Sequence, residues 1–422
     1  MTAKSVAEEA EEQAAPGQQD AGAPAYRDPA VLRWLGAYTA STLGDSVYYL
    51  ALSWAAVRGG TPAEAGVLMA VSALPRALLM LGGGVVADRF GPRRVVLGSD
   101  AVRCAATAAV AVLILATSPG LWLLAVLAVV FGTVDALFLP AVGALPARIA
   151  PPGQLARIQG MRGLAHRAGL LLGAPLGGLA VALGGPAAAF AAAALLFAAS
   201  LPLLASLRMP RLPADPGRPP GTARRDLAEG LRYLRGHRVL APLVVVTALV
   251  DLGVVGPLNV GLALLAEARG WGASGIGWVL AGFGAGSALA SLLMGVRGRI
   301  PAAGLTLTWL LIPGAVCVAA LALLPSLAAA VGAAVAAGVL GGLSGVLCHS
   351  LLQTHAAPAF LGRVTSVSTL FSLGVAPLTF PLTGAAIGRW GPGPVFVASA
   401  ALCALAGVYG LCRPALRRAE LP

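Results

Sequence analysis

Long apolar stretches separated by short polar turns fill the chain from about residue 32 to residue 412. A helix needs about 20 apolar residues to cross a hydrocarbon layer roughly 30 Å thick. Twelve stretches are long enough, with approximate bounds 32–57, 64–87, 93–116, 120–147, 153–182, 186–206, 238–266, 273–296, 302–324, 327–353, 360–388 and 392–412. The pattern predicts an all-α polytopic membrane protein with twelve transmembrane helices.

The composition excludes an ordinary soluble enzyme, because 11% of the 422 residues are charged, whereas soluble domains carry about 25%. The net charge of +12 does not indicate a nucleic-acid partner, since the basic residues lie in turns between apolar stretches. The five cysteines lack CxxC spacing and the four histidines lack an HExxH motif, so we expect no metal and no cofactor. A Walker sequence, which direct coupling to ATP would need, does not occur.

The arginines predict the orientation, because positive residues in short loops stay on the cytoplasmic side. They gather after the second, fourth, eighth and tenth stretches and in the connection 208–237, while the opposite loops hold only Arg58, Arg269 and Arg389. We therefore expect a multi-pass protein of the plasma (inner) membrane with both termini in the cytoplasm. Residues 1–30 are acidic, rich in Pro, Gly, Ala and Gln, and lack the features of a signal peptide, which predicts a disordered cytoplasmic tail.

The two halves of the chain repeat one another at an offset of 206 residues. The offset pairs Pro175 with Pro381 and Asp45 with Asp251. Two halves of the same orientation predict parallel six-helix repeats about an axis along the membrane normal, with a site near the midplane, as in alternating-access carriers. We expect an N-terminal bundle at 31–207, a cytoplasmic linker at 208–237, a C-terminal bundle at 238–412 and a cytoplasmic tail at 413–422.

The turn after the second stretch carries Gly84-Val-Val-Ala-Asp88-Arg89-Phe-Gly91-Pro92-Arg93-Arg94. This segment resembles the G-x-x-x-D-R-x-G-R-R signature of the major facilitator superfamily, with Pro92 in place of a basic residue. The resemblance implies the major facilitator fold. It also implies a latch that holds the two halves together in the outward-open state, formed by Gly84, Asp88, Arg89, Gly91, Arg93 and Arg94.

Three further segments resemble the macrolide-efflux and enterobactin-export branch of that superfamily. They are Ser41-Thr-Leu-Gly44-Asp45, Asp100-Ala-Val-Arg103 and Gly256-Pro257-Leu258-Asn259-Val260. Asp100 and Arg103 are three residues apart, so we expect them to neutralise one another or to contact the latch, and we group them with it. The resemblance implies a small-molecule substrate in a monomer embedded in the lipid bilayer, without fixing which compound is carried.

The fifth stretch contains Gly169-Leu-Leu-Leu-Gly173-Ala-Pro175-Leu-Gly177-Gly178, which is similar to the Gly/Pro motif of superfamily antiporters. We expect Gly173, Pro175, Gly177 and Gly178 to let this helix bend and pack closely. Close packing without any role in antiport is an equally good interpretation.

Ionisable residues inside a membrane span are costly, so each is a candidate functional site. Asp45 is the first candidate for proton coupling, because Tyr48 and Tyr49 follow it at helical spacing and place two hydroxyls on its face. Permanent hydrogen bonding of Asp45 between helices is the structural alternative. The further candidates for the substrate and proton cavity are Asp251, Asp135, Arg76 and Asn259. His166 and Arg167 are expected to lie near the cytoplasmic headgroups.

These features favour a proton-coupled carrier that exports a small amphipathic compound, such as a drug or a macrolide-like or siderophore-like metabolite. Proton symport for uptake and lipid flipping are alternatives within transport. A membrane-embedded enzyme or a sensor are alternatives of another class, but the dispersed charges do not form the clustered nucleophile and base that an enzyme needs. We therefore do not expect catalytic residues.

Overall fold

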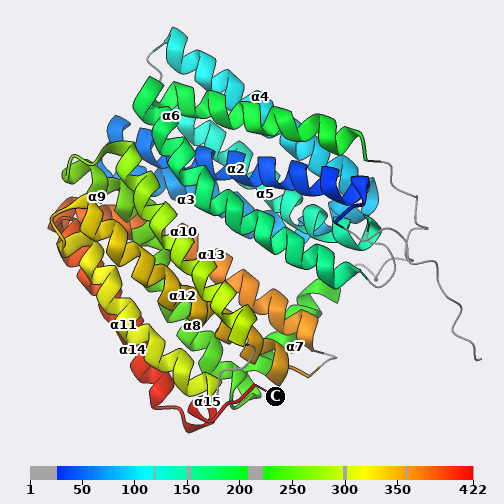
Figure 1. Ribbon diagram of the computed structural model, residues 1–422, viewed down its shortest axis with the longest axis vertical. Helices are drawn as coiled ribbons and strands as arrows, with labels where there is room; N and C mark the ends of the chain where they lie inside the picture. Colours follow the sequence, from blue (N-terminus) through cyan, green and yellow to red (C-terminus); the bar gives the residue numbers. More distant parts are fainter. Residues whose placement is uncertain are drawn as a thin grey trace, which may run out of the picture.

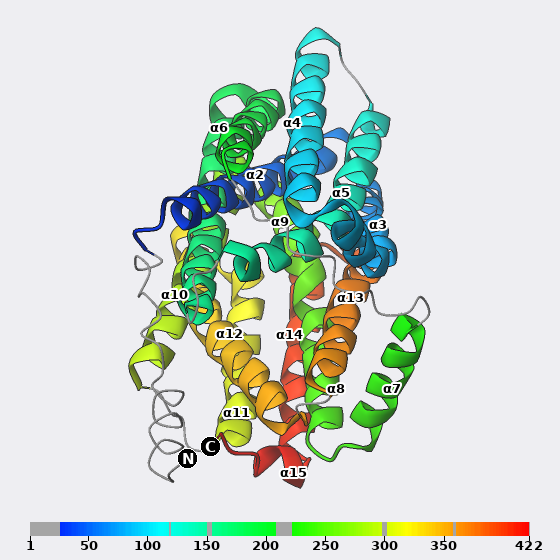
Figure 2. The same ribbon diagram turned by 90° about the vertical axis from the view of Figure 1, so that its right-hand side faces the viewer.

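The computed structural model describes residues 26–117, 120–149, 154–207, 222–297, 302–357 and 360–421. Almost all of this part of the chain is helical, and it contains no strand. The predictions for tail residues 1–25 and for the first part of the linker, 208–221, lie outside the described residues. The helices form two bundles that lie side by side, one built from each half of the chain (Figures 1 and 2).

The first bundle is built from five helical elements. They are α2 (Pro29–Gly59), α3 (Pro62–Phe90), α4 (Pro92–Ala116), α5 (Leu121–Ile149) and α6 (Leu155–Ala205). Several helices begin with a proline, which is suited to the first turn because its missing N–H would have no partner there. Thr61 caps α3, accepting from the N–H of Glu64 while the Glu64 carboxylate accepts from the N–H of Thr61.

The second bundle follows the connecting helix α7 (Thr222–Gly236) and ends at the short helix α15 (Pro414–Arg417). Its members are α8 (Leu240–Gly256), the π-helical turn η1 (Pro257–Gly261), α9 (Leu262–Ala268), α10 (Gly272–Arg297), α11 (Ala303–Leu323), α12 (Leu327–His355), α13 (Leu361–Trp390) and α14 (Pro392–Leu411). The segments α8, η1 and α9 are continuous and together are long enough to cross a membrane.

Ten helices of the described part are long and apolar enough to span a membrane. One of them covers residues 157–205, and its backbone leaves the helical conformation at Gly184 and Gly185, which divides α6 into two arms. Helix α2 is not among the ten, because its Tyr, Ser and Thr residues lower its hydropathy, although it is 31 residues long. The polytopic all-α fold is thus confirmed, while the number twelve stays a prediction.

The helix bounds follow the repeat found in the sequence. Helix α12 begins and ends 206 residues after α5, and both are 29 residues long. Helix α13 begins 206 residues after α6, and α14 begins 206 residues after Pro186 in the second arm of α6. Matching apolar patterns thus form matching helices in the two bundles.

The bundles meet mainly through two helix pairs, α6 with α10 and α3 with α13, and α2 adds smaller contacts with α9 and α10. Glycines allow the backbones to approach: a Cβ on Gly178 would lie 2.7 Å from the carbonyl oxygen of Ala273, and one on Gly277 would lie 2.8 Å from that of Ala174. Gly66 and Gly384 play the same part between α3 and α13. All these contacts lie towards the end of the molecule at which α3 and α10 begin.

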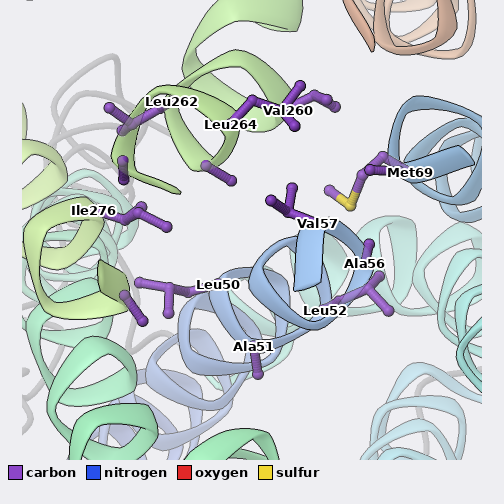
Figure 3. Packing of buried hydrophobic residues seen from close by; sticks show 14 of the residues in the cluster. Leu50, Ala51, Leu52, Ala56, Val57, Met69, Val260, Leu262, Leu264 and Ile276 are labelled. Atoms are coloured by element: carbon purple, nitrogen blue, oxygen red, sulfur yellow. The ribbon is translucent and has the colours of Figure 1, made fainter. Parts of the chain in front are cut away.

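An apolar core continues across the two bundles at that same end. Figure 3 shows Val57 of α2 facing Val260 and Leu264, while Leu50 faces Ile276 of α10. Burial of these side chains stabilises the contact between bundles in addition to the glycine-mediated packing.

The segments that precede and follow the second bundle both form hydrogen bonds to it. In α7, the hydroxyl of Tyr233 accepts from the N–H of Ala357 at 3.1 Å. The C-terminal segment 413–422, predicted as a tail, contains the fully buried Leu416, and the N–H of Gly304 donates to the carbonyl of Ala419 at 3.0 Å. This tail therefore packs against the start of α11.

Candidate functional site

Five charged side chains meet inside the first bundle, and we call them the acid cluster. Three are carboxylates from three helices: Asp45 of α2, Asp100 of α4 and Asp135 of α5. Two are guanidinium groups: Arg76 of α3 and Arg103 of α4. The cluster therefore joins four of the five helices of this bundle.

Arg103 lies at the centre of the cluster and contacts all three carboxylates. Its Nη1 atom lies 3.4 Å from Oδ1 of Asp100 and 3.6 Å from Oδ1 of Asp45. Its Nη2 atom donates to Oδ1 of Asp135. The side chain is 1% exposed, and its guanidinium carbon lies 4.1 Å from the centroid of the Phe138 ring. Carboxylates and an aromatic face thus take the place of water around this cation.

The carboxylate of Asp100 is fully buried and accepts from three donors. The hydroxyls of Ser41 and Ser200 both donate to its Oδ2 atom, the second at 2.5 Å, and Arg103 donates to Oδ1. Ser41 belongs to α2 and Ser200 to the second arm of α6. Asp100 is therefore a well-compensated group that connects three helices.

The carboxylate of Asp135 is also well compensated. Tyr49 donates to its Oδ2 atom at 2.7 Å, and Nη1 of Arg76 lies 3.8 Å from the same oxygen. With the hydrogen bond from Arg103, two cations and one hydroxyl face this group, which is 6% exposed. These contacts are charge-assisted and stabilise the ionised form of the carboxylate.

Asp45 is the least compensated member of the cluster. Its Oδ1 atom is buried, and among the described residues it has no hydrogen-bond partner; its only close cation is Arg103, at 3.6 Å. A quarter of its side chain (25%) remains exposed, compared with 6% for Asp135 and 0% for Asp100. Asp45 thus combines weak compensation with access from outside the bundle.

The two tyrosines that follow Asp45 at helical spacing make no described hydrogen bond to its carboxylate. Tyr49 reaches Asp135, and the ring of Tyr48 stacks on Phe131 with 3.5 Å between centroids. Among the described residues, the hydroxyl of Tyr48 has no hydrogen-bond partner. Tyr48 is therefore part of the apolar core beside the cluster.

Arg103 and Asp100 belong to the acid cluster and do not contact the latch arginines in the part of the chain that the structure describes. Because each helical residue rises 1.5 Å, Arg103 lies about 17 Å along α4 from Pro92. Sequence reasoning underestimated this depth. The separation of eleven positions between Pro92 and Arg103 was the signal that could have corrected it. Ser41, one helical turn before Asp45, was also missed.

The candidates of the second bundle lie apart from the cluster. Asp251 of α8 accepts from the hydroxyl of Ser372 of α13 at 2.6 Å. The side-chain amide of Asn259 donates to the carbonyl of Val255 at 2.8 Å, within the π-helical region. The carbonyl of Asn259 accepts from Ser53 of α2 at 3.1 Å, so this residue lies at the contact between bundles.

The latch segment makes its described contacts within the first bundle. Nε of Arg93 donates to the carbonyl of Leu204 at 3.1 Å, and Nη2 donates to that of Ala205, at the C-terminus of α6. A cation is favourable there because of the helix dipole. Gly91 has a φ of 86° between α3 and α4, a conformation that favours glycine, while Arg89 and Arg94 are exposed. The side chains of Gly84 and Asp88 lie outside the described residues.

The Gly/Pro motif of α6 packs against two helices. Cβ atoms on Gly173 and Gly177 would lie 2.4 Å from Cβ of Ser46 and 3.2 Å from Cα of Val47, both on α2. Gly178 faces α10, and Pro175 lies next to Gly277 of that helix. The motif therefore provides the close packing that the sequence allowed for.

Known proteins are similar to this chain over most of its length. The model of the Major Facilitator Superfamily matches residues 34–369. The Multidrug efflux pumps Tap of Mycobacterium tuberculosis and Mycobacterium bovis are 28% identical to it, over 94% of this chain and 96% of theirs.

Solved structures share the fold at low sequence identity. A bacterial homologue of the human lysosomal transporter Spinster, in an inward-facing and occupied conformation, is 16% identical with a TM-score of 0.71, covering 93% of this chain and 97% of that one. The nucleoside transporter NupG is 12% identical with a TM-score of 0.71, covering 91% and 98%. From the family match and the fold together, we conclude that this multi-pass membrane protein belongs to the major facilitator superfamily.

Proposed function

We propose that the protein is a secondary active transporter of the plasma membrane that exchanges protons for a small amphipathic compound by alternating access. The charge balance of the acid cluster is the observation that carries the proposal. Three carboxylates face two guanidinium groups, so the fully ionised cluster holds one excess negative charge. One bound proton removes that excess, and a site that gains and loses one proton is what coupling requires.

Asp45 is the member of the cluster that binds this proton. Asp100 and Asp135 each accept hydrogen bonds from an arginine and from hydroxyl groups, which stabilise their ionised forms. Asp45 has only the 3.6 Å contact with Arg103 and is the most exposed of the three. Protonation of Asp45 therefore loses less electrostatic stabilisation than protonation of Asp100 or Asp135.

Export is the direction favoured by the similarity to the Multidrug efflux pump Tap. Drugs and macrolide-like or siderophore-like metabolites are the compounds we consider. The distribution of arginines along the chain favours an orientation with both termini in the cytoplasm. In that orientation the glycine-mediated contacts between the bundles lie at the outer end, and a substrate enters from the cytoplasm.

Alternation then requires these outer contacts to separate while the inner ends of the two bundles, 31–207 and 238–412, approach. The small residues Gly177 and Gly178 let α6 change its packing against α2 and α10. Arg93, anchored to the end of α6, is positioned to carry the latch between the bundles in the opposite state.

Inverted membrane vesicles containing the full-length protein test the proposal. With an acid interior, we expect addition of a transported dye to release protons and the dye to accumulate. Ethidium, Nile red and fluorescein supply a cationic, a neutral and an anionic probe. In Asp45→Asn the gradient-driven accumulation should fall to the level of vesicles without the protein. Glu420→Gln, which removes an exposed acid, is the matched control and should keep full activity.

Two results would contradict the proposal. The first is a wild-type protein that moves none of the probes and releases no protons. The second is an Asp45→Asn variant that keeps full proton-driven accumulation. The second result would remove the coupling assignment and leave the chain as a carrier driven in another way.

A further inference from the structure

Arg167 belongs to the first arm of α6, and among the described residues no carboxylate pairs with it. It follows Arg157, where the candidate membrane span begins, by ten residues, so it lies about 15 Å along the helix from there. A charged side chain within a membrane-spanning helix is costly, which makes Arg167 a candidate functional residue.

Two other arginines within the helices of the first bundle have acidic partners, and Arg167 differs from them. Arg76 and Arg103 contact aspartates of the acid cluster. The described contact of Arg167 is a hydrogen bond from Nη1 to the carbonyl of Ser287 on α10, at 3.2 Å. Within the described residues no carboxylate lies within ion-pair distance of it. A guanidinium group has five N–H donors, so most of its binding capacity is left for a ligand.

Arg167 lines a cavity of about 390 Å³ between α6, α10 and α12. Phe283 supplies an aromatic face, and the other polar groups on the wall come from Ser287, His349, Ser350 and Gln353. The lining contains no Asp or Glu. The volume is within the range of small-molecule sites, roughly 300–1,000 Å³, and so is the combination of an apolar wall with a few convergent polar groups.

We infer that this cavity binds a small amphipathic anion, whose carboxylate, sulfonate or phosphate group pairs with Arg167. Arginine suits such groups because its planar fork donates two parallel hydrogen bonds. His349 and Gln353 can donate to the remaining oxygens, and the apolar body of the ligand lies against Phe283. The inference names a substrate class for the proposed carrier and rests on that proposal, but the binding itself is measurable without transport.

Gly345 offers a way to fill the cavity without disturbing its walls. It lines the cavity, and a Cβ atom built there meets no atom within 4 Å. A leucine at this position would therefore project into open space. Helix propensity also favours leucine over glycine, so the variant should fold. Gly332, on the same helix, likewise meets nothing within 4 Å but does not line the cavity, which makes it the matched control.

Isothermal titration of the purified full-length protein in a non-ionic detergent tests the inference. The probes are naphthalene-2-sulfonate and the N,N,N-trimethyl-2-naphthylammonium cation, which share a ring system and differ in the sign of the charge. We expect the anion to bind at least ~10-fold more tightly than the cation, since a charge-assisted hydrogen bond accounts for at least that ratio. Arg167→Gln and Gly345→Leu should each weaken anion binding by ~10-fold or more.

The control variants test whether a change in affinity comes from the cavity or from the loss of any positive charge. Arg162→Gln removes an arginine of α6 that lies over the Tyr38 ring, outside the cavity, and should leave the affinity unchanged, as should Gly332→Leu. Absence of anion binding, equal affinity for the cation, or an unchanged affinity in both Arg167→Gln and Gly345→Leu would overturn the inference. In the vesicle assay, transport of ethidium alone would overturn it while leaving proton-coupled export intact. Anion binding by a protein that shows no proton-driven transport would support the inference and contradict the proposed function.

Discussion

The two bundles share a backbone plan and differ in chemistry. Asp45 and Asp251 are repeat mates, 206 residues apart. Asp45 faces a buried arginine among other carboxylates, whereas Asp251 accepts a hydrogen bond from Ser372 and has no ion pair within the described residues.

The remaining members of the acid cluster have no charged counterpart. At the same offset, Arg76, Asp100, Arg103 and Asp135 correspond to Gly282, Thr306, Trp309 and Gly341. Gly341 lines the cavity that Arg167 enters. Repetition of the apolar pattern thus preserved the helices, while the second bundle has uncharged residues at the positions of these four charges. We interpret this difference in charge as a difference in function: the acid cluster binds the proton, and the cavity beside Gly341 binds the ligand.

The largest effect is expected from Arg103→Met. Removing the central cation leaves the three carboxylates of the cluster with Arg76 alone among the described residues, and breaking a buried ion pair costs about 3–5 kcal/mol. The unfolding free energy, measured by SDS titration in mixed micelles, should fall by that amount. Its repeat mate provides the control: Trp309 is 57% exposed on the bundle surface, and Trp309→Leu should change stability by less than about 0.5 kcal/mol. Similar losses in both variants would contradict the asymmetry.

An intermediate effect is expected from Asp135→Asn. The amide keeps the size of the side chain but removes the charge that Arg76 and Arg103 both contact, which should cost about 1.5–3 kcal/mol. Gly341→Ala is the matched change in the other bundle. Its Cβ would lie 3.9 Å from the Phe283 ring, an ordinary contact, so we expect almost no loss. The same titration measures both, and a greater loss in Gly341→Ala would refute the comparison.

The smallest effects concern the hydroxyls that hold the carboxylates. Ser200→Ala should cost about 1 kcal/mol, because it removes one donor from the buried Asp100. Ser372→Ala should cost about the same at Asp251. The two bundles differ in the double variant Ser41→Ala/Ser200→Ala. Both hydroxyls donate to Oδ2 of Asp100, so the loss of unfolding free energy in the double variant should differ from the sum of the two single losses. Additive losses would show that the two hydroxyls act independently.

Much of the fold could be predicted from the sequence, because a membrane span needs an apolar length that can be counted. The bounds of α5 and α12 and the 206-residue offset follow from that pattern. The break at Gly184 and Gly185 lies between the predicted fifth and sixth stretches. Helix α2 shows that hydropathy alone does not identify every helix of the bundle. Its polar residues lower its hydropathy and pack against α6 and other helices.

The candidate site was only partly predictable. Asp45, Asp135 and Arg76 stood out because charge inside an apolar stretch is rare. Arg103 was expected to pair with Asp100 or to contact the latch, and its contacts with Asp45 and Asp135 were not predicted. Tertiary packing, and not spacing along one helix, decides which helix faces lie together. The cavity was equally hidden, since a glycine such as Gly345 reveals nothing of the space beside it until its neighbours are placed.

The central claim is that Asp45 binds the coupling proton while Asp100 and Asp135 stay ionised. Infrared difference spectra of the reconstituted protein between acidic and alkaline pH measure this directly through the C=O stretching band of a protonated carboxyl group. We predict that the wild-type difference spectrum contains a C=O band that is missing from Asp45→Asn and present in Asp251→Asn. An Asp45→Asn spectrum that keeps every wild-type band, or loss of a band only in Asp251→Asn, would contradict the account.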